Sequence, residues 1–587
     1  MATIESFAPV PKARTDNFST VESFAPLLQE PIWQQSRELE ASSAEARTRL
    51  AYARARSLVK AVGMTIGDVH SLKPKFWNFH RHAFSLDSGA WTIMTIHWNL
   101  CMGTLSSFLS ERPDLLPLLK ALERFDVCGE FLLTELGHGL DVRNLETTAT
   151  LQADGSFVLH TPNPRAAKTM PPSSPHLGMA RTAVVFARLM VAGKDHGVRS
   201  FIVPLNDASG AMCRGVSCTL FPARPGAKAI DHSSTSFSHV PLPAEALLGH
   251  LRGSPKDERK DFLRAIHRVA VGTLCLSTSN ATVLRVAGCI AGRYSAQRRV
   301  GAPEPVPILS FSTQHGPIAR ILAHSVVFDS YAIESKNMFM ANFGKPDIQS
   351  VVGGVFKATV LSYTQKALSD LVDRCGWQGL YAHNQISELW LAEKGNSIAE
   401  GDYVVLCIRL ASEVLLGRYA PPAPRDPQCL LARHEAGVWE EARKLCASLK
   451  GGHRGKEFNA RILPLTLPLV QATGQRMAYE AARDAMLHGN DGGLVVTPQV
   501  LALYESTCMM EDQSWYIENG IMSRRALLDH DANAVNSMLP LLEDMTNDPA
   551  IDAFVNAPMV DQDRLAAFFA SLPTFKGPKT EPLRARI

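Results

Sequence analysis

The chain has 587 residues, of which 46% are hydrophobic and 20% charged, and its net charge is +3. This composition is that of an ordinary globular protein, and the length predicts about three or four domains. The small net charge gives no support for binding to nucleic acid or to an anionic membrane surface. No uninterrupted apolar run approaches the roughly 20 residues that span a bilayer.

The eleven cysteines are scattered along the chain and include no CxxC pair. This spacing is typical of a reduced intracellular protein, so we expect no disulfide framework and no metal site. The N-terminal residues, MATIESFAPVPKARTDNFST, lack the apolar core of a secretion signal. The first forty or so residues are predicted to be an irregular leader.

Residues 1–130 are predicted to form a mostly α-helical N-terminal domain. Ser42 and Glu45 occupy the first and fourth positions of a capping box, in front of the helix-forming run EARTRLAYARARSLVKAV. His80 and His82 lie two residues apart on a segment that we expect to be irregular. We therefore interpret them as surface residues and not as metal ligands.

Residues 131–250 are predicted to form a β domain, because they are rich in Thr, Val and Phe. The runs SFVLHT, AVVFARLMV and RSFIVPL are typical of strands in an antiparallel barrel or sandwich. Turns are expected at Asp154-Gly155 and Asn206-Asp207. A charged linker, Gly249 to Lys260, follows and contains GSPKDERKD.

Long helical patterns return after the linker and occupy residues 260–420. A Pro-rich break, PPAPRDP, separates them from residues 428–587, which are helical again with Gly- and Pro-containing loops. The predicted fold class is α+β and mainly α. It has an N-terminal helical domain, a middle antiparallel β domain and two C-terminal helical domains.

The most informative motif is the run TELGHGLDVRNLETTAT at 134–150. Gly137 and Gly139 let the backbone approach a flat ligand or adopt positive φ, and Thr134 offers a hydroxyl and an N–H to a heteroatom-rich ring. A simple turn between a helix and a strand is the alternative interpretation. The run resembles the flavin-contacting signature of the acyl-CoA oxidases, the peroxisomal branch of the acyl-CoA dehydrogenase superfamily.

The resemblance covers residues 70–420 and implies the fold described above, bound FAD and a homodimer. The family places a Cys-Gly-Gly-His-Gly run on the flavin pyrophosphate, often across the dimer interface. The corresponding residues here are CGWQGL, which assigns Gly376 and Gly379 to the cofactor through an anion-binding turn. Trp377 and Gln378 replace the family's glycine and histidine. A helix C-cap at Gly376 is the alternative.

A second flavin-phosphate motif follows from the resemblance. RYSAQRR and ILSFSTQHG are similar to the family's Tyr-Ser-x-x-Arg-Arg and Ile-Leu-Asp-Phe-x-Thr-Gln runs. They imply that Arg298 and Gln314 contact FAD, and the guanidinium fork suits a phosphate. By itself, an arginine pair at the end of a helix would be a solvated cap.

The run SIAEGDY resembles the family's Glu-Gly-Glu-Asn, whose first glutamate is the catalytic base. The resemblance therefore assigns Glu400 as the base, Gly401 to the substrate and Asp402 to the cofactor. Removal of a proton next to a thioester carbonyl needs a base whose pKa is raised by burial, and donors on the thioester oxygen. Both carboxylates would also serve as helix caps, and the two roles are compatible.

Two segments depart from the family. The family's Lys-Trp-Trp-x-Gly-Gly run, which lines the flavin, is replaced by KTMPPSS at 168–174. The family's Asp-Asn-Gly is replaced at 231–233 by DHS, which leaves Asp231 and His232 as the candidate substrate contacts.

The leading hypothesis is a FAD-dependent oxidoreductase acting on a CH–CH bond, an acyl-CoA oxidase of fatty acid β-oxidation. It would desaturate an acyl thioester and pass electrons to O2, forming hydrogen peroxide. Two alternatives stay open: an enzyme of the same fold with a specialised substrate of secondary-metabolite type, and a non-catalytic scaffold. The C-terminal Ala585-Arg586-Ile587 resembles a small–basic–aliphatic peroxisomal signal, so we expect a peroxisomal location, or otherwise a cytoplasmic one.

Overall fold

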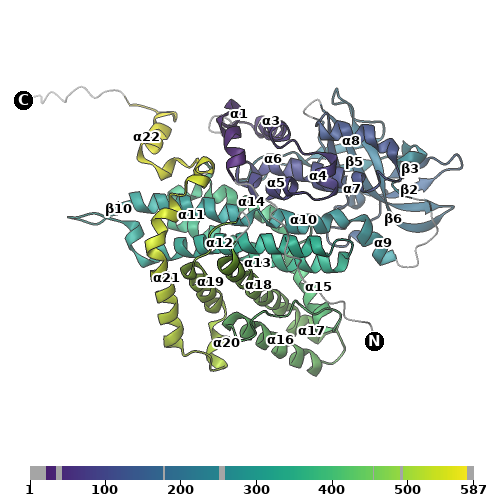
Figure 1. Cartoon of the computed structure of the whole chain (residues 1–587). Coiled ribbons are helices and arrows are strands. Elements are labelled where there is room, and N and C mark those ends of the chain that lie inside the picture. Colours follow the sequence, from purple (N-terminus) through teal and green to yellow (C-terminus); the bar gives the residue numbers. More distant parts are fainter. Residues whose placement is uncertain are drawn as a thin grey trace, which may run out of the picture.

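The computed structural model describes residues 21–34, 42–175, 179–249, 251, 258–453, 455–489 and 493–577. Most of the predicted leader, the centre of the charged linker and the C-terminal tripeptide lie outside these ranges. The fold is α+β and mainly helical, as predicted, with most strands gathered at one end of a large helical body and a short hairpin, β10 (Arg299–Val300) and β11 (Val306–Pro307), at the opposite end (Figure 1).

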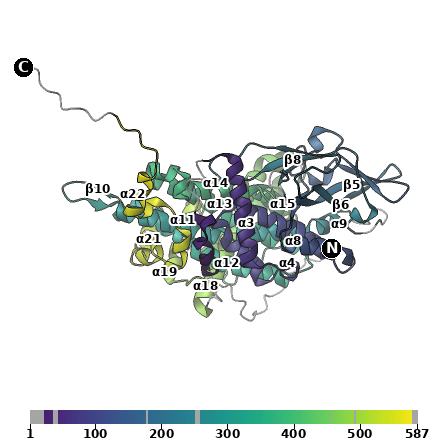
Figure 2. The ribbon, with the colours of Figure 1, turned by 90° about the horizontal axis from the view of Figure 1, so that it is seen from above.

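The N-terminal part consists of short helices that pack against α10 and α11 of the C-terminal half. They are η1 (Val21–Gln29), α1 (Pro31–Gln34), α3 (Ala44–Val62), α4 (Ile66–His70), α5 (Pro74–His82), α6 (Ser88–Thr95), the π-helix η3 (Ile96–Met102), α7 (Gly103–Ser107) and α8 (Leu116–Glu123). The side chain of Ser43 caps α3 by accepting a hydrogen bond from the Ala46 N–H at 3.2 Å. The cap therefore lies one residue after the predicted Ser42. Seen from above, α3 crosses the middle of the molecule (Figure 2).

His80 and His82 are buried at the end of α5, so the prediction of an irregular surface segment is wrong. The His80 ring lies 2.8 Å from both the Phe76 carbonyl oxygen and the Thr95 hydroxyl, and the His82 ring lies 3.0 Å from the Thr282 hydroxyl. These partners make the burial tolerable, and burial lowers the pKa of His80 to about 3. Within the described ranges, no group of three or more His, Cys, Asp or Glu could hold a metal ion.

The strands form two main sheets, and the larger one is mixed where we predicted antiparallel pairing. Its order is β1 (Val127–Leu132), β5 (Ala180–Val191), β2 (Thr148–Leu151), β3 (Phe157–His160) and β9 (Val240–Leu242), with β6 (Lys194–Asn206) also paired to β5. β1 and β2 run parallel to β5, which their long connections to it allow. A smaller antiparallel sheet has the order β4 (Lys168–Pro172), β8 (His232–Phe237) and β7 (Val216–Leu220).

The C-terminal half is built around two long buried helices, α12 (Ser312–Ala341) and α13 (Pro346–Arg374). The other helices of at least eight residues are α9 (Glu258–Ala265), α10 (His267–Ser277), α11 (Asn280–Gln297), α14 (Ile386–Ile398), α15 (Tyr403–Leu415), α16 (Leu430–Ser448), α18 (Thr466–His488), α19 (Pro498–Glu511), α21 (Arg524–Thr546) and α22 (Gln562–Ala570). The stretch formed by α10 and α11 is long and apolar enough to cross a membrane, but 94% of its apolar window is buried inside the protein. One hydrophobic core runs through the N-terminal and C-terminal helices, and a second lies in the larger sheet.

The contact between α13 and α18 gives a test of this packing. A Cβ atom added to Gly474 of α18 would overlap the side chain of Thr359 in α13. We expect Gly474→Ala to destabilise the protein by about 1–3 kcal/mol through overpacking. Gly316→Ala in α12 is the control, because a Cβ there meets no atom within 4 Å and alanine favours helix by about 1 kcal/mol. Thermal unfolding measures both, and equal unfolding temperatures would contradict the packing.

Candidate active site

Glu400 lies in the short turn that joins α14 to α15. Its backbone is left-handed, with φ of 57°, and Gly401 follows with φ of 99°. Asp402 then caps α15, because its Oδ1 accepts hydrogen bonds from the Val404 and Val405 N–H groups at 2.9 and 3.2 Å. The capping interpretation of Asp402 is confirmed, and its assignment to the cofactor stays a prediction.

The side chain of Glu400 is directed at α10 and the π-helix η3. A Cβ atom on Gly272 of α10 would lie 2.6 Å from the Glu400 carboxyl carbon and 2.9 Å from the Asn99 amide nitrogen. A glycine at position 272 therefore makes the space for this carboxyl group. Burial raises the pKa of Glu400 to about 8, against the opposing effect of the positive charges on Lys357 and Arg268.

Hydrogen bonds to three consecutive backbone carbonyl groups hold the turn around Glu400. The Nζ of Lys357, in α13, donates hydrogen bonds to the carbonyl oxygens of Ala399 and Gly401, the latter at 2.7 Å. The hydroxyl of Thr273 donates to the carbonyl oxygen of Glu400 at 2.7 Å. Lys357 is fully buried, and burial lowers its pKa to about 8. Lys357 was not predicted from the sequence, although a lone lysine in the apolar run GVFKATVL was a usable signal.

Arg268 connects this cluster to the N-terminal helices. Its side chain donates to the carbonyl oxygens of Asn99 and Val69 at 2.8 and 3.2 Å, and the Asn99 amide donates back to the Arg268 carbonyl at 3.1 Å. Burial lowers the pKa of Arg268 to about 10. These bonds fix η3 on α10, and therefore fix the wall that the Glu400 carboxyl faces.

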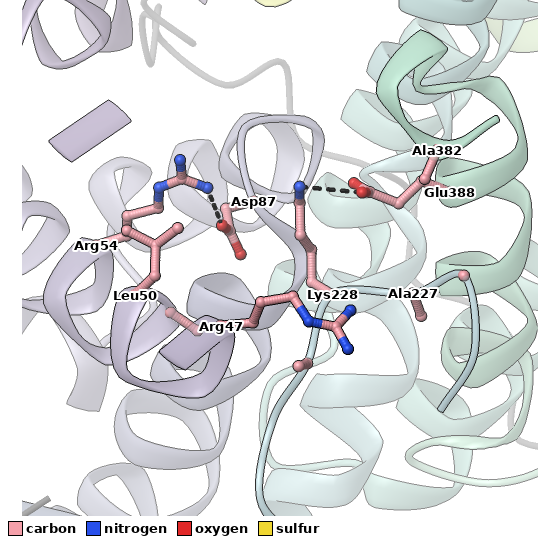
Figure 3. A pocket seen from close by; sticks show the side chains of 11 residues that line it. Arg47, Leu50, Arg54, Asp87, Ala227, Lys228, Ala382 and Glu388 are labelled. Carbon is pink, nitrogen blue, oxygen red and sulfur yellow. Dashed lines mark hydrogen bonds and ion pairs between the residues drawn. The ribbon is translucent and has the colours of Figure 1, made fainter. Parts of the chain in front are cut away.

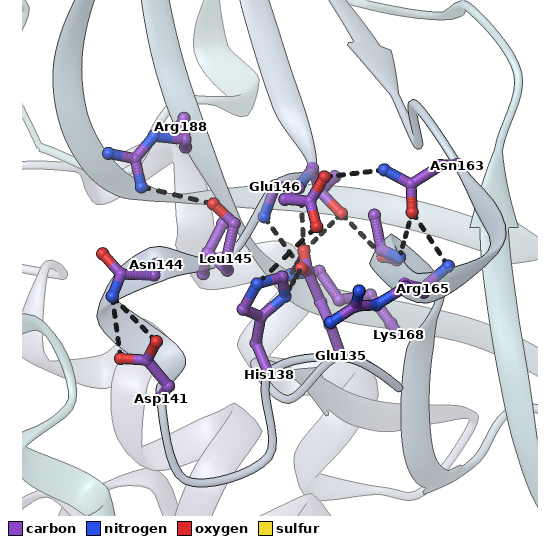
Figure 4. A network of polar contacts seen from close by, with 12 residues as sticks. Glu135, His138, Asp141, Asn144, Leu145, Glu146, Asn163, Arg165, Lys168 and Arg188 are labelled. Atoms are coloured by element: carbon purple, nitrogen blue, oxygen red, sulfur yellow. Dashed lines mark hydrogen bonds and ion pairs between the residues drawn. The ribbon is translucent and has the colours of Figure 1, made fainter.

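The loop that carries Thr134 is organised by a buried carboxylate, Glu135 (Figure 4). Glu135 pairs with Lys168 at 3.0 Å and accepts hydrogen bonds from the Glu146 N–H and from the N–H and hydroxyl of Thr147 at 2.7–2.9 Å. His138 lies 3.1 Å from its other oxygen. Burial would raise the pKa of Glu135, but Lys168 and these donors outweigh it, so the pKa is lowered. Glu135 was not among the residues predicted from the sequence.

The two glycines of this loop differ in their surroundings. A Cβ on Gly137 would lie 3.0 Å from the Arg165 side chain, whereas a Cβ on Gly139 would meet no atom within 4 Å. The carbonyl oxygen of Thr134 accepts a hydrogen bond from the Thr169 N–H at 3.0 Å. Exposed leucines lie just before and just after the two glycines, with Leu136 54% and Leu140 64% exposed. The loop therefore presents open, apolar space beside Gly139.

The helix η3 lies between this loop and Glu400. Its residue Asn99 faces the Glu400 carboxyl, and its residue His97 accepts a hydrogen bond from the Gly129 N–H of β1 at 2.8 Å. β1 ends at Leu132, two residues before Thr134. The helix η3 therefore contacts both β1, which leads into the loop of Thr134, and the carboxyl group of Glu400.

Gln314, Gly376, Gly379 and Arg298 gather at one end of α11, α12 and α13. The Gln314 amide donates to the Ser295 hydroxyl and the Arg374 carbonyl at 2.8 and 2.9 Å. A Cβ on Gly379 would overlap the Val372 carbonyl oxygen, and Gly376 has φ of 56°. The structure includes no ion-pair partner for the exposed Arg298 within its described ranges. Trp377 is 57% exposed, so its bulk is directed to the surface.

Asp231 and His232 are engaged in contacts within the protein. Asp231 is buried and accepts hydrogen bonds from the Tyr52 and Ser174 hydroxyls at 3.0 and 2.7 Å. His232 donates to the Met170 carbonyl oxygen at 2.6 Å. These contacts join the two segments that depart from the family, because β4 and β8 are paired neighbours in one sheet. The roles of Asp231 and His232 as substrate contacts stay predictions.

Comparison with known proteins agrees with this architecture. The family model for the acyl-CoA oxidase C-alpha1 domain matches residues 271–415, which contain Thr273, Lys357 and Glu400. Acyl-coenzyme A oxidase acox-1.1 of Caenorhabditis elegans is 28% identical over 342 residues, covering 54% of this chain and 49% of that protein. Acyl-coenzyme A oxidase 2, peroxisomal, of Arabidopsis thaliana is 29% identical over 324 residues, covering 51% and 46%. The chain spans about half the length of the curated relatives it matches.

Solved structures share the fold over nearly the whole chain. Acyl-CoA oxidase 1 of Yarrowia lipolytica has a TM-score of 0.78 at 18% identity, covering 95% of this chain and 91% of that one. Acyl-CoA oxidase 1 of Arabidopsis thaliana has a TM-score of 0.76 at 18% identity, covering 94% and 91%. The fold is thus that of the acyl-CoA oxidases. The family model and the curated relatives agree with the resemblance of the sequence to the acyl-CoA oxidase family.

The buried pair Glu135–Lys168 gives a prediction about the loop of Thr134. Removing one partner of a buried ion pair costs about 3–5 kcal/mol, so we expect Lys168→Met to raise amide hydrogen exchange across residues 134–147. The double variant Glu135→Gln/Lys168→Met leaves no unpaired charge and should regain part of the protection. Lys194→Met, at an exposed lysine of β6, is the control. Unchanged exchange in Lys168→Met would show that the pair does not organise the loop.

Proposed function

We propose that the protein is a FAD-dependent acyl-CoA oxidase in which Glu400 is the catalytic base. The observation that carries the proposal is the Glu400 carboxyl group, which is directed into the protein against Gly272 and has a pKa raised to about 8. Glu400 also occupies the family's base position, inside the segment that the C-alpha1 model matches. A carboxylate with this pKa can take a proton from carbon near neutral pH.

The residues of this chain fit FAD at two places. The open space beside Gly139, with exposed Leu136 and Leu140, suits a flat ring, and Thr134 would hold the ring edge. At the far end of α13, Arg298 and the turn Gly376–Gly379 would hold the phosphates, and Gln314 braces that turn through the Arg374 carbonyl. Acyl-CoA oxidase-1 of Caenorhabditis elegans, which shares this fold with a TM-score of 0.76, was solved in complex with FAD and ATP.

In the proposed reaction Glu400 takes the proton from the α-carbon of the acyl thioester. The electrons of that C–H bond form the new double bond as hydride leaves the β-carbon. Bound FAD would supply the acceptor for the hydride and transfer both electrons to O2, which is reduced to hydrogen peroxide. The Gly401 N–H would donate to the thioester oxygen, where negative charge builds up. Lys357 acts as a positioning residue, because it holds both neighbouring peptides of Glu400.

A specialised acyl thioester is the second candidate substrate, and the small sheet favours it. The segments 168–174 and 231–233 both depart from the family and lie on the paired strands β4 and β8. Ser173 and Ser233 are buried and hydrogen-bonded at 2.6 Å, so the two replaced segments are joined to each other. Acyl-CoA oxidase-2 of Caenorhabditis elegans, with the same fold, was solved with FAD, ascaroside-CoA and ATP bound.

We also propose a peroxisomal location and a homodimer. Relatives in Arabidopsis thaliana and Homo sapiens are named peroxisomal acyl-coenzyme A oxidases. The exposed side chains of Trp377, Leu380 and Tyr381 support an interface at the turn after α13.

The absorption spectrum of the purified protein tests the proposal. We expect flavin bands that bleach when an acyl-CoA is added without oxygen, and that return when air is admitted. A panel of fatty and specialised acyl-CoA esters separates the two substrate classes. A protein with no flavin would contradict both enzyme proposals and favour the non-catalytic scaffold.

Replacement of Glu400 tests its role as the base. We expect Glu400→Gln to retain the flavin spectrum and to lose about 10²- to 10⁴-fold in kcat, the usual contribution of a positioned base. Glu393→Gln is the matched control, because Glu393 is also buried, lies in α14 and has a pKa raised to about 8 by burial. Its carboxyl faces Ser279 and Asn396 instead of Gly272. Equal losses in the two variants would contradict the assignment.

The pH profile tests the role of Lys357. Because the base must be ionised, kcat/KM should rise with pH around the Glu400 pKa of about 8. The positive charge on Lys357 lowers that pKa, so Lys357→Met should raise it and shift the rise to higher pH. Thr273→Val removes a hydrogen bond to the same turn without removing a charge, and should leave the midpoint in place. A profile that does not move in Lys357→Met would contradict the coupling.

A further inference from the structure

A cavity of about 160 Å³ lies where three parts of the chain meet (Figure 3), and Glu400 is not among its lining residues. Its walls come from α3, from Asp87 at the start of α6, from the loop that joins β7 to β8, and from Ala382 and Glu388 near the start of α14. Five charged side chains line it, and four of them form pairs. Arg54 pairs with Asp87 at 2.6 Å, and Lys228 pairs with Glu388 at 3.0 Å.

The fifth charge, Arg47, has no counterpart. Its Nε is buried and has no hydrogen-bond partner. The residues that the structure describes also provide no ion pair for its guanidinium, and no dashed line reaches it in Figure 3. Since both acids of the cavity are already neutralised, the wall carries one net positive charge, and it is on Arg47.

We propose that this cavity binds a small carboxylate or phosphate anion against Arg47. The guanidinium fork matches both groups, and an unpaired buried donor is costly until it finds an acceptor. The volume corresponds to about five water molecules at the roughly 30 Å³ that each occupies in the liquid. The remaining wall is apolar, with Leu50 and small alanines, and this accommodates a compact organic acid.

The position of the cavity connects its ligand to the turn of Glu400. The loop between β7 and β8 is attached to α14, because Arg224 donates to the Leu391 carbonyl oxygen at 2.6 Å. A Cβ on Gly226 of the same loop would overlap the Leu391 side chain. α14 ends at Ile398, two residues before Glu400. An anion held between α3 and this loop would therefore act on the helix that leads to Glu400.

Equilibrium dialysis with radiolabelled inorganic phosphate tests the site. The full-length protein is used with excess FAD and coenzyme A, so that their own phosphate sites are occupied, and the ionic strength is kept constant with sodium chloride. Malonate is the carboxylate probe and is measured directly and as a competitor. We expect saturable binding that Arg47→Gln weakens about tenfold or more, as for the loss of charge-assisted hydrogen bonds.

Arg49→Gln is the matched control. Arg49 lies on the same helix and pairs with Glu45 on the exposed side, so its replacement removes the same charge outside the cavity. Binding of phosphate or malonate that Arg47→Gln loses and Arg49→Gln keeps supports the site, and the tighter probe identifies the class of ligand. Equal binding by the two variants, or binding of neither probe to the wild type, overturns the proposal. Arg47→Gln should unfold near the wild-type temperature without anion, since the described residues give the Arg47 side chain no hydrogen bond or ion pair to lose.

Discussion

The turn of Glu400 depends on one buried cation, Lys357. A non-glycine residue with left-handed backbone costs about 1–2 kcal/mol, and Glu400 adopts it with φ of 57°. Hydrogen bonds from charged groups contribute about 1.5–3 kcal/mol each, so the two that Lys357 makes outweigh this cost. With the bond from Thr273, they fix the backbone from which the Glu400 carboxyl extends toward Gly272. The orientation of the candidate base is thus decided by α10 and α13.

The same principle recurs in the loop of Thr134, where Lys168 is the buried cation. Burial lowers the pKa of both lysines to about 8, yet each donates hydrogen bonds to two oxygen acceptors. Removing such a group from water is costly, and good geometry with several acceptors offsets the cost. Each lysine helps to fix a turn, together with the bond from Thr273 at Glu400 and the bonds to Glu135 at the loop of Thr134. The helix η3 contacts β1, which precedes the loop of Thr134, and also contacts Glu400, so it connects two segments that are distant in sequence.

The departures from the family are concentrated and not scattered. KTMPPSS and DHS lie about sixty residues apart in sequence, but β4 and β8 place them side by side. Their serines and Asp231 bond to one another, so a change in one segment alone would leave buried hydroxyls without partners. The residues around Glu400 lie outside this sheet. The substrate surface can therefore differ from that of relatives while the turn of the base is retained.

The sequence by itself determined the fold class and strands at 157–160 and within 180–206, because these depend on local periodicity. The resemblance of the contiguous run SIAEGDY to a family motif marked Glu400 as the candidate base. It also located the cap of α3 to within one residue. Only the tertiary structure decided that β1 and β2 run parallel to β5, and that His80 and His82 are buried, since pairing and burial depend on partners far away in sequence. Lys357, Arg268 and Gly272 were missed for the same reason: their contacts with Glu400 exist only once α10 and α13 have packed around it.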